Sequence, residues 1–278
     1  MKIAVVAPAN MLPHDVPEKI IALAQARFAD KAPDIAFHPQ CFLSSGHFAG
    51  PDQAREDALV DVANDPKVDA VWFARGGYGS NRIAERAIAR MGPAAREKPF
   101  LGYSDNGFIL AGLLAKGIGE PVHAPMPNDI NKPGGDDAVA RSLEWLLLDA
   151  GPRRRFYSGA RTHDADSGKY AAFNMMVFSQ LLGTSLQPDL TGRTLMLEEV
   201  DEALYAIDRS FFHITSNPGV RKCAGIMLGR CAPITPNNPD FGSDEEAIAK
   251  HWCAVSGIPY RGRADIGHDA DNKVVPFG

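Results

Sequence analysis

Short apolar runs alternate with longer amphipathic ones through the first half of the chain. The apolar runs are continuous rather than alternating, which is typical of parallel strands buried on both faces. They lie at 2–7, 35–38, 68–74 and 98–103, and runs with helical spacing lie at 16–30, 51–64, 105–117 and 136–149. Strands that alternate with helices predict a mostly parallel sheet with helices on both faces.

Two domains are expected from the length of 278 residues and from where this alternation stops. We predict an N-terminal, doubly wound, Rossmann-like α/β domain over 1–150 and a C-terminal mixed α/β, barrel-like domain over 170–278. The stretch 151–169 between them is predicted to be a linker. It contains three consecutive arginines at 153–155, the only basic cluster, which we interpret as a solvated face of that linker.

The most informative residue is Ser104, which stands between the apolar run 98–103 and the helical run 105–117. At this corner a hydroxyl meets unpaired N–H groups and the positive end of a helix dipole, which favour negative charge. The corner is similar to the nucleophile elbow of serine hydrolases, although Asn106 replaces the second glycine of G-x-S-x-G. Alternatively, Ser104 caps the helix, a common role for serine.

A second corner of the same kind occurs earlier in the chain, where the run 68–74 leads into RGGYG at 75–79. The Gly76–Gly77 pair allows the backbone to approach a ligand closely, and its N–H groups can point at an oxyanion. The pair is otherwise a plain turn. Arg75 is a candidate for binding a substrate carboxylate, with a structural salt bridge as the alternative.

The second half of the chain supplies a carboxylate and a histidine. An apolar run ends in Glu198 and Glu199, Glu202 follows, and His268 lies in the polar segment RADIGHDADN. Serine, histidine and a carboxylate form hydrolytic triads, which are defined by geometry and not by chain order. A strand-end carboxylate and a turn-capping histidine are the structural alternatives, so the residues alone leave a triad open.

Seven segments, in order along nearly the whole chain, are similar to the LD-carboxypeptidases, a serine-peptidase family that also contains the microcin-immunity peptidases. They are KIAVVAPAN, ARGGYGSNRI, LGYSDN, VHAPM, NMMVFSQLLGT, LMLEEVDEALYAIDR and GHDADNKVVPFG. The resemblance implies that Ser104 is the nucleophile, Glu198 the triad carboxylate and His268 the base. It also implies an oxyanion hole formed by the N–H groups of Gly77 and Asp105.

The resemblance further implies a homodimer and a substrate. The murein branch of the family hydrolyses the L,D-amide before the terminal D-alanine of murein tetrapeptide, and the microcin-immunity branch cleaves peptidyl- or aminoacyl-adenylate analogues. We expect the murein reaction, because the three tryptophans available to stack on a base lie in structural runs. Phe173 and Ala124 stand where the family usually has glycine, and the chain stops at Gly278. These departures concern the shape of the pocket more than catalysis.

Composition restricts the partners. The formal net charge of −5 argues against nucleic acid, because phosphate binding requires a basic face. No apolar run is long enough to span a membrane, and prolines interrupt the N-terminal segment too early for a secretory signal, which predicts a cytoplasmic protein. The four cysteines lack C-x-x-C and zinc spacing, and no nucleotide-binding glycine motif occurs. We therefore expect no cofactor and no metal.

Two other classes of function stay open at this point. One is a non-catalytic protein that holds a small anion at the helix starts after Gly77 and Ser104. The other is a metal-dependent hydrolase that uses His268, Asp269 and Asp271, although this set lacks a second histidine at metal spacing.

Overall fold

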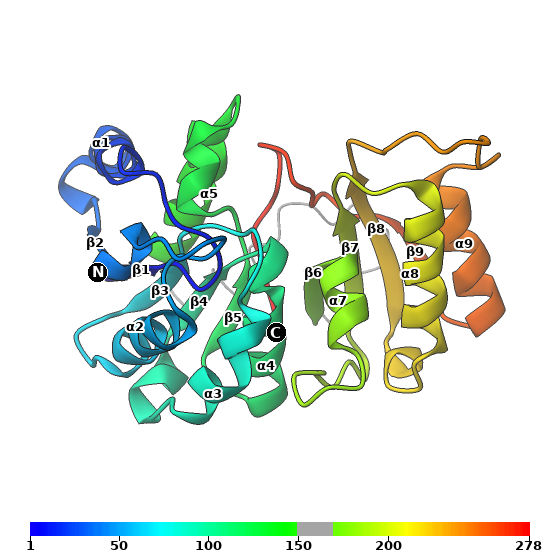
Figure 1. Ribbon diagram of the computed structural model, residues 1–278, viewed down its shortest axis with the longest axis horizontal. Helices are drawn as coiled ribbons and strands as arrows, with labels where there is room; N and C mark the ends of the chain where they lie inside the picture. The colour runs from blue at the N-terminus through cyan, green and yellow to red at the C-terminus, as the bar shows by residue number, and fades with distance from the viewer. Residues whose placement is uncertain (149–168) are drawn as a thin grey trace.

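The computed structural model describes residues 1–148 and 169–278, which form two α/β units that lie side by side (Figure 1). The predicted linker, apart from Lys169, lies outside the described residues, and so does its arginine cluster at 153–155.

The first unit is built on a six-stranded sheet. Five of its strands are parallel, and the sixth, from the end of the chain, runs antiparallel to its neighbour. The strand order is β10-β5-β4-β3-β1-β2. The strands are β1 (Lys2–Val6), β2 (Asp34–Phe37), β3 (Ala70–Phe73), β4 (Pro99–Gly102), β5 (Glu120–His123) and β10 (Val275–Pro276).

Helices cover both faces of this sheet, which confirms the doubly wound arrangement. Helices α1 (Val16–Phe28) and α5 (Gly135–Leu147) bury their apolar residues in one core with side chains of one sheet face. Helices α2 (Asp52–Asn64), α3 (Asn81–Ala89) and α4 (Gly107–Lys116) bury theirs in a second core on the other face. The continuous apolar strands follow from this double coverage.

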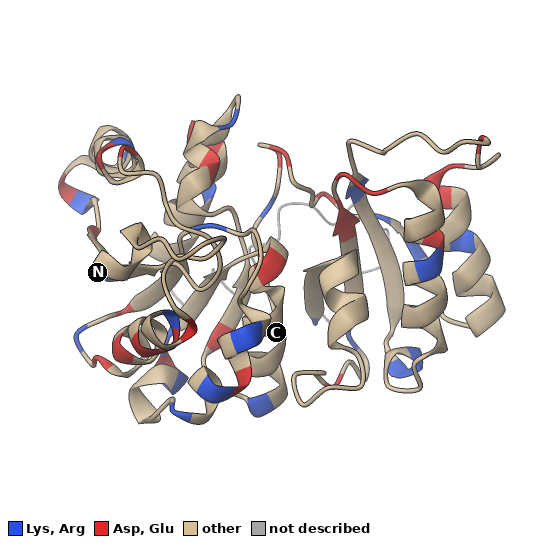
Figure 2. Cartoon of the chain, in the orientation of Figure 1, with Lys and Arg blue, Asp and Glu red and all other residues tan. Residues whose placement is uncertain are grey.

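Opposite charges join α2 and α3 on the outside of this layer, where Figure 2 shows both signs close together. Glu56 is almost buried and pairs with Arg86 at 2.7 Å and with Arg90 at 2.8 Å. Asp52 pairs with Arg82 at 2.8 Å and also contacts the buried Arg55. The two helices that follow β2 and β3 are thereby held at a fixed separation.

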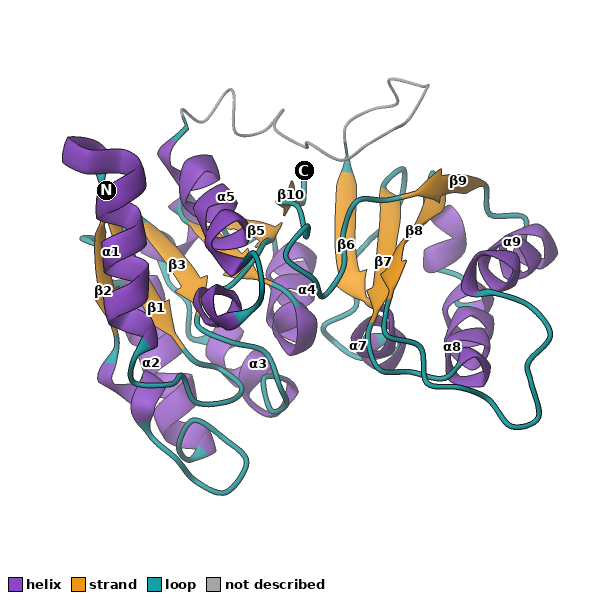
Figure 3. Cartoon of the chain, turned by 90° about the horizontal axis from the view of Figure 1, so that it is seen from above, coloured by secondary structure: helices purple, strands orange, loops and turns teal. Residues whose placement is uncertain are grey.

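The second unit has a four-stranded parallel sheet with the order β6-β7-β8-β9, and the α/β class is confirmed (Figure 3). This sheet is open between β6 and β9, which is simpler than the expected barrel-like form, because four strands are too few to close around a core of side chains. Its elements are β6 (Tyr170–Asn174), α7 (Met175–Leu181), β7 (Thr194–Glu199), α8 (Leu204–Ser216), β8 (Gly225–Cys231), α9 (Glu245–Ser256) and β9 (Tyr260–Arg263).

The two units share one apolar core, which extends from α4 to α7 and the second sheet. Two glycines of α4 permit this approach. A Cβ on Gly107 would lie 3.0 Å from Val177, and one on Gly112 would lie 2.8 Å from Leu186. Phe173 is buried in this core and packs on the ring of Phe277, near the strand β10 that returns to the first sheet.

Candidate active site

Ser104 lies directly beyond the carboxyl end of β4, in a short 3-10 turn (Ser104–Asn106) that leads into α4. Its φ is +59°, in the left-handed region that serine rarely adopts. Such strain is typical of functional corners, and it presents the hydroxyl above the sheet, as a nucleophile elbow does. Helix α4 has Asn106 at its N-cap position, so the interpretation of Ser104 as the helix cap is wrong.

The structure brings Ser104, His268 and Glu198 together from both units. Nε2 of His268 lies 3.0 Å from Oγ of Ser104, and Nδ1 lies 2.5 Å from Oε2 of Glu198. Both imidazole nitrogens are therefore engaged, one with a hydroxyl and the other with a carboxylate. Glu198 is completely buried, and Gly229 on β8 makes room for it, because a Cβ there would lie 2.8 Å from the Cβ of Glu198.

Glu199, the neighbouring candidate, points elsewhere. Its carboxylate accepts hydrogen bonds from Asn174 Nδ2 at 2.6 Å and from the backbone N–H groups of Met176 and Val200. Asn174 in turn caps α7 by accepting from Val177 N. Burial raises the pKa of Glu199 to about 7. Glu199 and Asn174 thus stabilise the start of α7, and Glu202 makes no side-chain contact with the histidine among the described residues.

Electrostatic effects on His268 oppose each other. Burial lowers the pKa of its imidazole, but the charge of Glu198 and the hydrogen bond to it raise the pKa by more, so the net shift is upward. A buried carboxylate favours the imidazolium form for this reason. The pair Glu198–His268 is therefore suited to accept a proton from a hydroxyl that contacts Nε2.

The RGGYG turn follows β3 and lies against Ser104. A Cβ on Gly76 would stand 2.9 Å from both Cβ and Oγ of the serine. Gly77 has a φ of +113°, which favours glycine, and its N–H donates no hydrogen bond to any residue that the structure describes. That N–H is therefore unpaired within the described residues, one position along the chain from Gly76, which lies against Ser104.

Asp105 and Ser80 fasten the two corners to each other. The Asp105 carboxylate accepts a hydrogen bond from Ser80 N at 2.8 Å, and Ser80 Oγ donates to the Asp105 carbonyl at 2.5 Å. Burial raises the pKa of the Asp105 carboxyl group. A further bond joins Asn106 Nδ2 to the carbonyl of Arg75 at 3.0 Å. These bonds fix the backbone of both turns, which is a requirement for preorganised N–H donors.

Arg75 is half-buried beside this turn. Its guanidinium donates to the carbonyl of Met11 at 3.3 Å, and it forms no ion pair within residues 1–148 and 169–278. The structural salt bridge considered for Arg75 is therefore not seen in the described part of the chain.

The loop that carries His268 is held from the second unit by Arg230. This arginine donates to Asp269 at 2.5 and 2.8 Å and also contacts Asp265. The carboxylate of Asp269 is thus hydrogen-bonded to Arg230, and the two ring nitrogens of His268 are hydrogen-bonded to Ser104 and Glu198. The side chains of His268, Asp269 and Asp271 consequently do not converge as a metal-ligand set.

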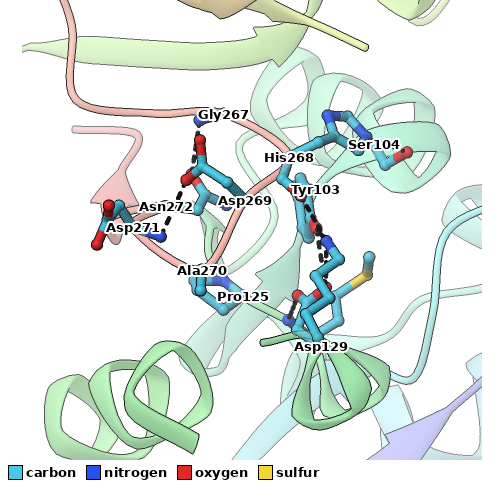
Figure 4. A network of polar contacts seen from close by, with 12 residues as sticks. Tyr103, Ser104, Pro125, Asp129, Gly267, His268, Asp269, Ala270, Asp271 and Asn272 are labelled. Atoms are coloured by element: carbon cyan, nitrogen blue, oxygen red, sulfur yellow. Dashed lines mark hydrogen bonds and ion pairs between the residues drawn. The ribbon is translucent and has the colours of Figure 1, made fainter. Parts of the chain in front are cut away.

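Residues of the first unit also hold this loop, and these were missed in the sequence. Lys132 donates to the carbonyl of His268 at 2.7 Å, to Tyr103 Oη at 2.8 Å, and pairs with Asp129 at 2.8 Å. Figure 4 shows Tyr103 between His268 and Asp129. Asn272 accepts from Gly267 N and contacts the buried His123 at 3.0 Å. The polar residues of the segment 125–135 are the signal in the sequence that could have indicated this role.

Comparisons with known proteins agree with this geometry. Residues 3–124 match the family model described as the LD-carboxypeptidase N-terminal domain, and residues 167–278 match the model of its C-terminal domain. A protein from Synechocystis sp., provisionally named a carboxypeptidase, is 31% identical over 237 residues, which cover 84% of this chain and 75% of that protein. The chain belongs to the LD-carboxypeptidase family. It is therefore a hydrolase of the serine-peptidase type.

Solved structures of other proteins have the same fold. The muramoyltetrapeptide carboxypeptidase from Oxalobacter formigenes has a TM-score of 0.76 at 21% identity. The matched region includes 99% of this chain and 93% of that protein. The microcin C7 self-immunity protein MccF, solved with aspartyl sulfamoyl adenosine, has a TM-score of 0.75 at 15% identity, covering 100% and 91%. In this LD-carboxypeptidase, the unusual Phe173 and Ala124 are both buried in apolar cores.

Within residues 1–148 and 169–278, the helices are too short or too polar to span a lipid bilayer.

Proposed function

We propose that this LD-carboxypeptidase hydrolyses the amide bond before the terminal D-alanine of murein tetrapeptide, with Ser104, His268 and Glu198 as a catalytic triad. The observation that carries the proposal is the continuous contact from Ser104 Oγ through the His268 imidazole to the buried Glu198 carboxylate. The murein substrate is supported by the fold shared with a muramoyltetrapeptide carboxypeptidase.

In the first step, Ser104 Oγ attacks the carbonyl carbon of the scissile amide while His268 Nε2 accepts the hydroxyl proton. Glu198 stabilises the imidazolium through Nδ1 and fixes the ring tautomer. The tetrahedral intermediate collapses when His268 returns the proton to the nitrogen of the departing D-alanine. Water then attacks the acyl-enzyme, again with His268 as base, and releases the tripeptide and the free serine.

Negative charge on the carbonyl oxygen is stabilised by the N–H groups of Gly77 and Asp105. The two groups belong to corners at the carboxyl ends of adjacent strands, where ligands of such sheets bind. The bonds between Asp105 and Ser80 hold these donors in place before substrate arrives. One such donor contributes about 2.7–4 kcal/mol to transition-state stabilisation.

Specificity for a carboxypeptidase substrate requires a partner for the terminal carboxylate, because a buried, unpaired carboxylate is costly. Arg75 fills this role, since it adjoins Gly76 and forms no ion pair with a described residue. Amidated tetrapeptide, which lacks this carboxylate, is therefore a poor substrate. The all-L isomer keeps the carboxylate and is a poor substrate because its terminal residue has the opposite configuration.

A second candidate function is cleavage of peptidyl- or aminoacyl-adenylate analogues by the same triad. It is favoured by the equally close fold of MccF, which was solved with an aminoacyl sulfamoyl nucleoside. The two functions differ in the group that leaves and not in the nucleophile.

The test is to incubate the protein with murein tetrapeptide, with its amidated form and with an aminoacyl-adenylate analogue, and to identify products by mass. Release of D-alanine from tetrapeptide alone supports the murein reaction, and cleavage of the adenylate analogue alone supports the alternative. Ser104→Ala, which removes only the hydroxyl, is the control in each case. A fluorophosphonate probe should label the wild-type protein and not this variant; absence of labelling would favour a non-catalytic anion-binding protein.

A further inference from the structure

Lys132 joins the two halves of the site at a point that the proposed mechanism does not use. Its three polar contacts are to the carbonyl of His268, to Tyr103 Oη and to the Asp129 carboxylate, all at 2.7 or 2.8 Å. Tyr103 directly precedes Ser104, and its ring lies 5.0 Å from the ring of His268. One cation thus touches the residue next to the serine and the backbone of the histidine.

Asp129 holds Lys132 in place through an ion pair. Its nearly buried carboxylate accepts from Tyr103 Oη at 2.9 Å and from Met126 N at 2.7 Å, in addition to the ion pair. Figure 4 shows Asp129 beneath Tyr103, on the side away from Ser104. These contacts pair the carboxylate, the cation and the phenol with one another, so each polar group of the cluster has a partner.

Other side chains hold different parts of the histidine loop. Arg230 binds the side chains of Asp265 and Asp269, and Arg141 binds the carbonyls of Ala270 and Asn272. Of the side chains in the described ranges, Lys132 alone reaches the backbone of residue 268. Glu198 and Ser104 bind the two ring nitrogens of His268, and Lys132 holds the backbone from which the ring projects, so the position of the imidazole beside Ser104 depends on both sets of contacts.

We propose that Lys132, held by Asp129 and Tyr103, is a positioning residue that fixes the His268 imidazole against Ser104. The inference rests on the roles proposed above for Ser104 and His268. A small displacement of the imidazole reduces proton transfer steeply, because reacting atoms must be held near their productive separation.

The charge of Lys132 gives this role a specific signature. It lowers the pKa of His268, against the upward effect of Glu198. The titratable and charged groups that face His268 from the surrounding elements are Glu198, Glu199, Lys132, Asp129, Tyr103, His123, Asp269 and Arg230. Removing the cation should therefore raise the pKa of His268, and the acidic limb of the pH–rate profile should move to higher pH.

The experiment compares Lys132→Met and Lys132→Arg with Lys116→Met, which removes an exposed lysine of α4 from the same unit. For Lys132→Met we expect kcat on tetrapeptide to fall about 10- to 100-fold with KM changed less than about threefold, and the acidic limb to shift upward. Lys132→Arg keeps the charge, so its limb should stay close to that of wild type. Lys116→Met should match wild type in both measurements.

A second measurement does not depend on turnover. The His268 pKa is determined by NMR in Ser104→Ala and in Ser104→Ala combined with Lys132→Met. A higher pKa in the double variant supports the proposal even if the wild-type enzyme releases no D-alanine, an outcome that would count only against the proposed substrate. If Lys132→Met does not fold, Lys132→Gln, which retains donors but not the charge, replaces it.

Three results would overturn the inference. The first is a folded Lys132→Met with wild-type kcat and an unmoved acidic limb. The second is a rise in KM alone, which would make Lys132 a substrate contact. The third is a lower Tm with an unchanged pKa of His268, which would make the cluster structural only.

Discussion

Replacing Glu198 by glutamine removes the buried negative charge that faces His268 and keeps the shape of the side chain. In the wild-type protein Oε2 lies 2.5 Å from Nδ1, and the carboxylate is completely buried. A hydrogen bond to a charged group contributes about 1.5–3 kcal/mol, which corresponds to a rate factor of about 10 to 150 if it is gained only as the imidazolium forms. We expect kcat for Glu198→Gln to be about 10 to 150 times lower than kcat for the wild-type protein.

The pH dependence gives the sign of the effect. In the proposed mechanism the neutral imidazole is the base, so activity is lost as the pH falls through the pKa of His268, which Glu198 holds above its ordinary value. Without the carboxylate the imidazole loses its proton more readily. The acidic limb of kcat in Glu198→Gln should therefore lie at lower pH than in wild type.

The assay measures D-alanine release across pH for wild type, Glu198→Gln and Glu199→Gln. Glu199 is a suitable control because it is a buried carboxylate on the same strand that does not bind the histidine. Its replacement should lower Tm and leave kcat within about threefold of wild type. A Glu198→Gln enzyme with a wild-type rate and an unmoved limb would refute the reasoning.

Three further predictions can be checked with the same substrate or by unfolding. Ser104→Ala and His268→Ala should each lower kcat about a thousandfold or more, and a residual rate above about a tenth would exclude the assigned nucleophile. Gly76→Ala should displace the serine, whose Oγ would lie 2.9 Å from the new Cβ, and lower kcat about 100-fold while Tm, measured alongside, changes little. Folding raises the pKa of Glu199 from 4.5 to about 7, so the folded protein binds more protons than the unfolded chain between these pH values. The free energy of unfolding of the wild-type protein should therefore decrease as the pH increases from about 4.5 to about 7. Urea titrations of Glu199→Gln should show a smaller decrease over the same pH range.

The main features of the fold were predictable because they follow from local patterns. The apolar runs at 68–74 and 98–103 predicted β3 and β4. Gly76 and Ser104, which follow these runs, marked the two turns between a strand and a helix. Periodicity could not choose between Glu198 and Glu199 on a strand buried on both faces. Because successive side chains of a strand point to opposite faces, Glu198 contacts His268 and Glu199 contacts the start of α7.

Features that depend on distant contacts were not predictable. Strand β10 has two residues and no periodicity, and it exists only because Val275 and Pro276 pair with β5 about 150 residues earlier in the chain. Asp129 lies in a short 3-10 turn (Pro127–Asn131) whose local sequence resembles a loop, and Lys132 directly follows that turn. Their role became visible only when the structure placed them against Tyr103 and the histidine loop.

The pairing of β10 with β5 has a consequence during synthesis. Ser104 and His268 are 164 residues apart, so at about 5–20 residues per second the histidine emerges roughly 10–30 s after the serine. From the emergence of β5 until that of β10, β5 is an uncovered edge of the first sheet, and such an edge can pair with another chain. The ribosome-bound chain can therefore form most of the first unit before the proposed triad is complete, and the same late segment that contains His268 also supplies the strand that covers the exposed edge.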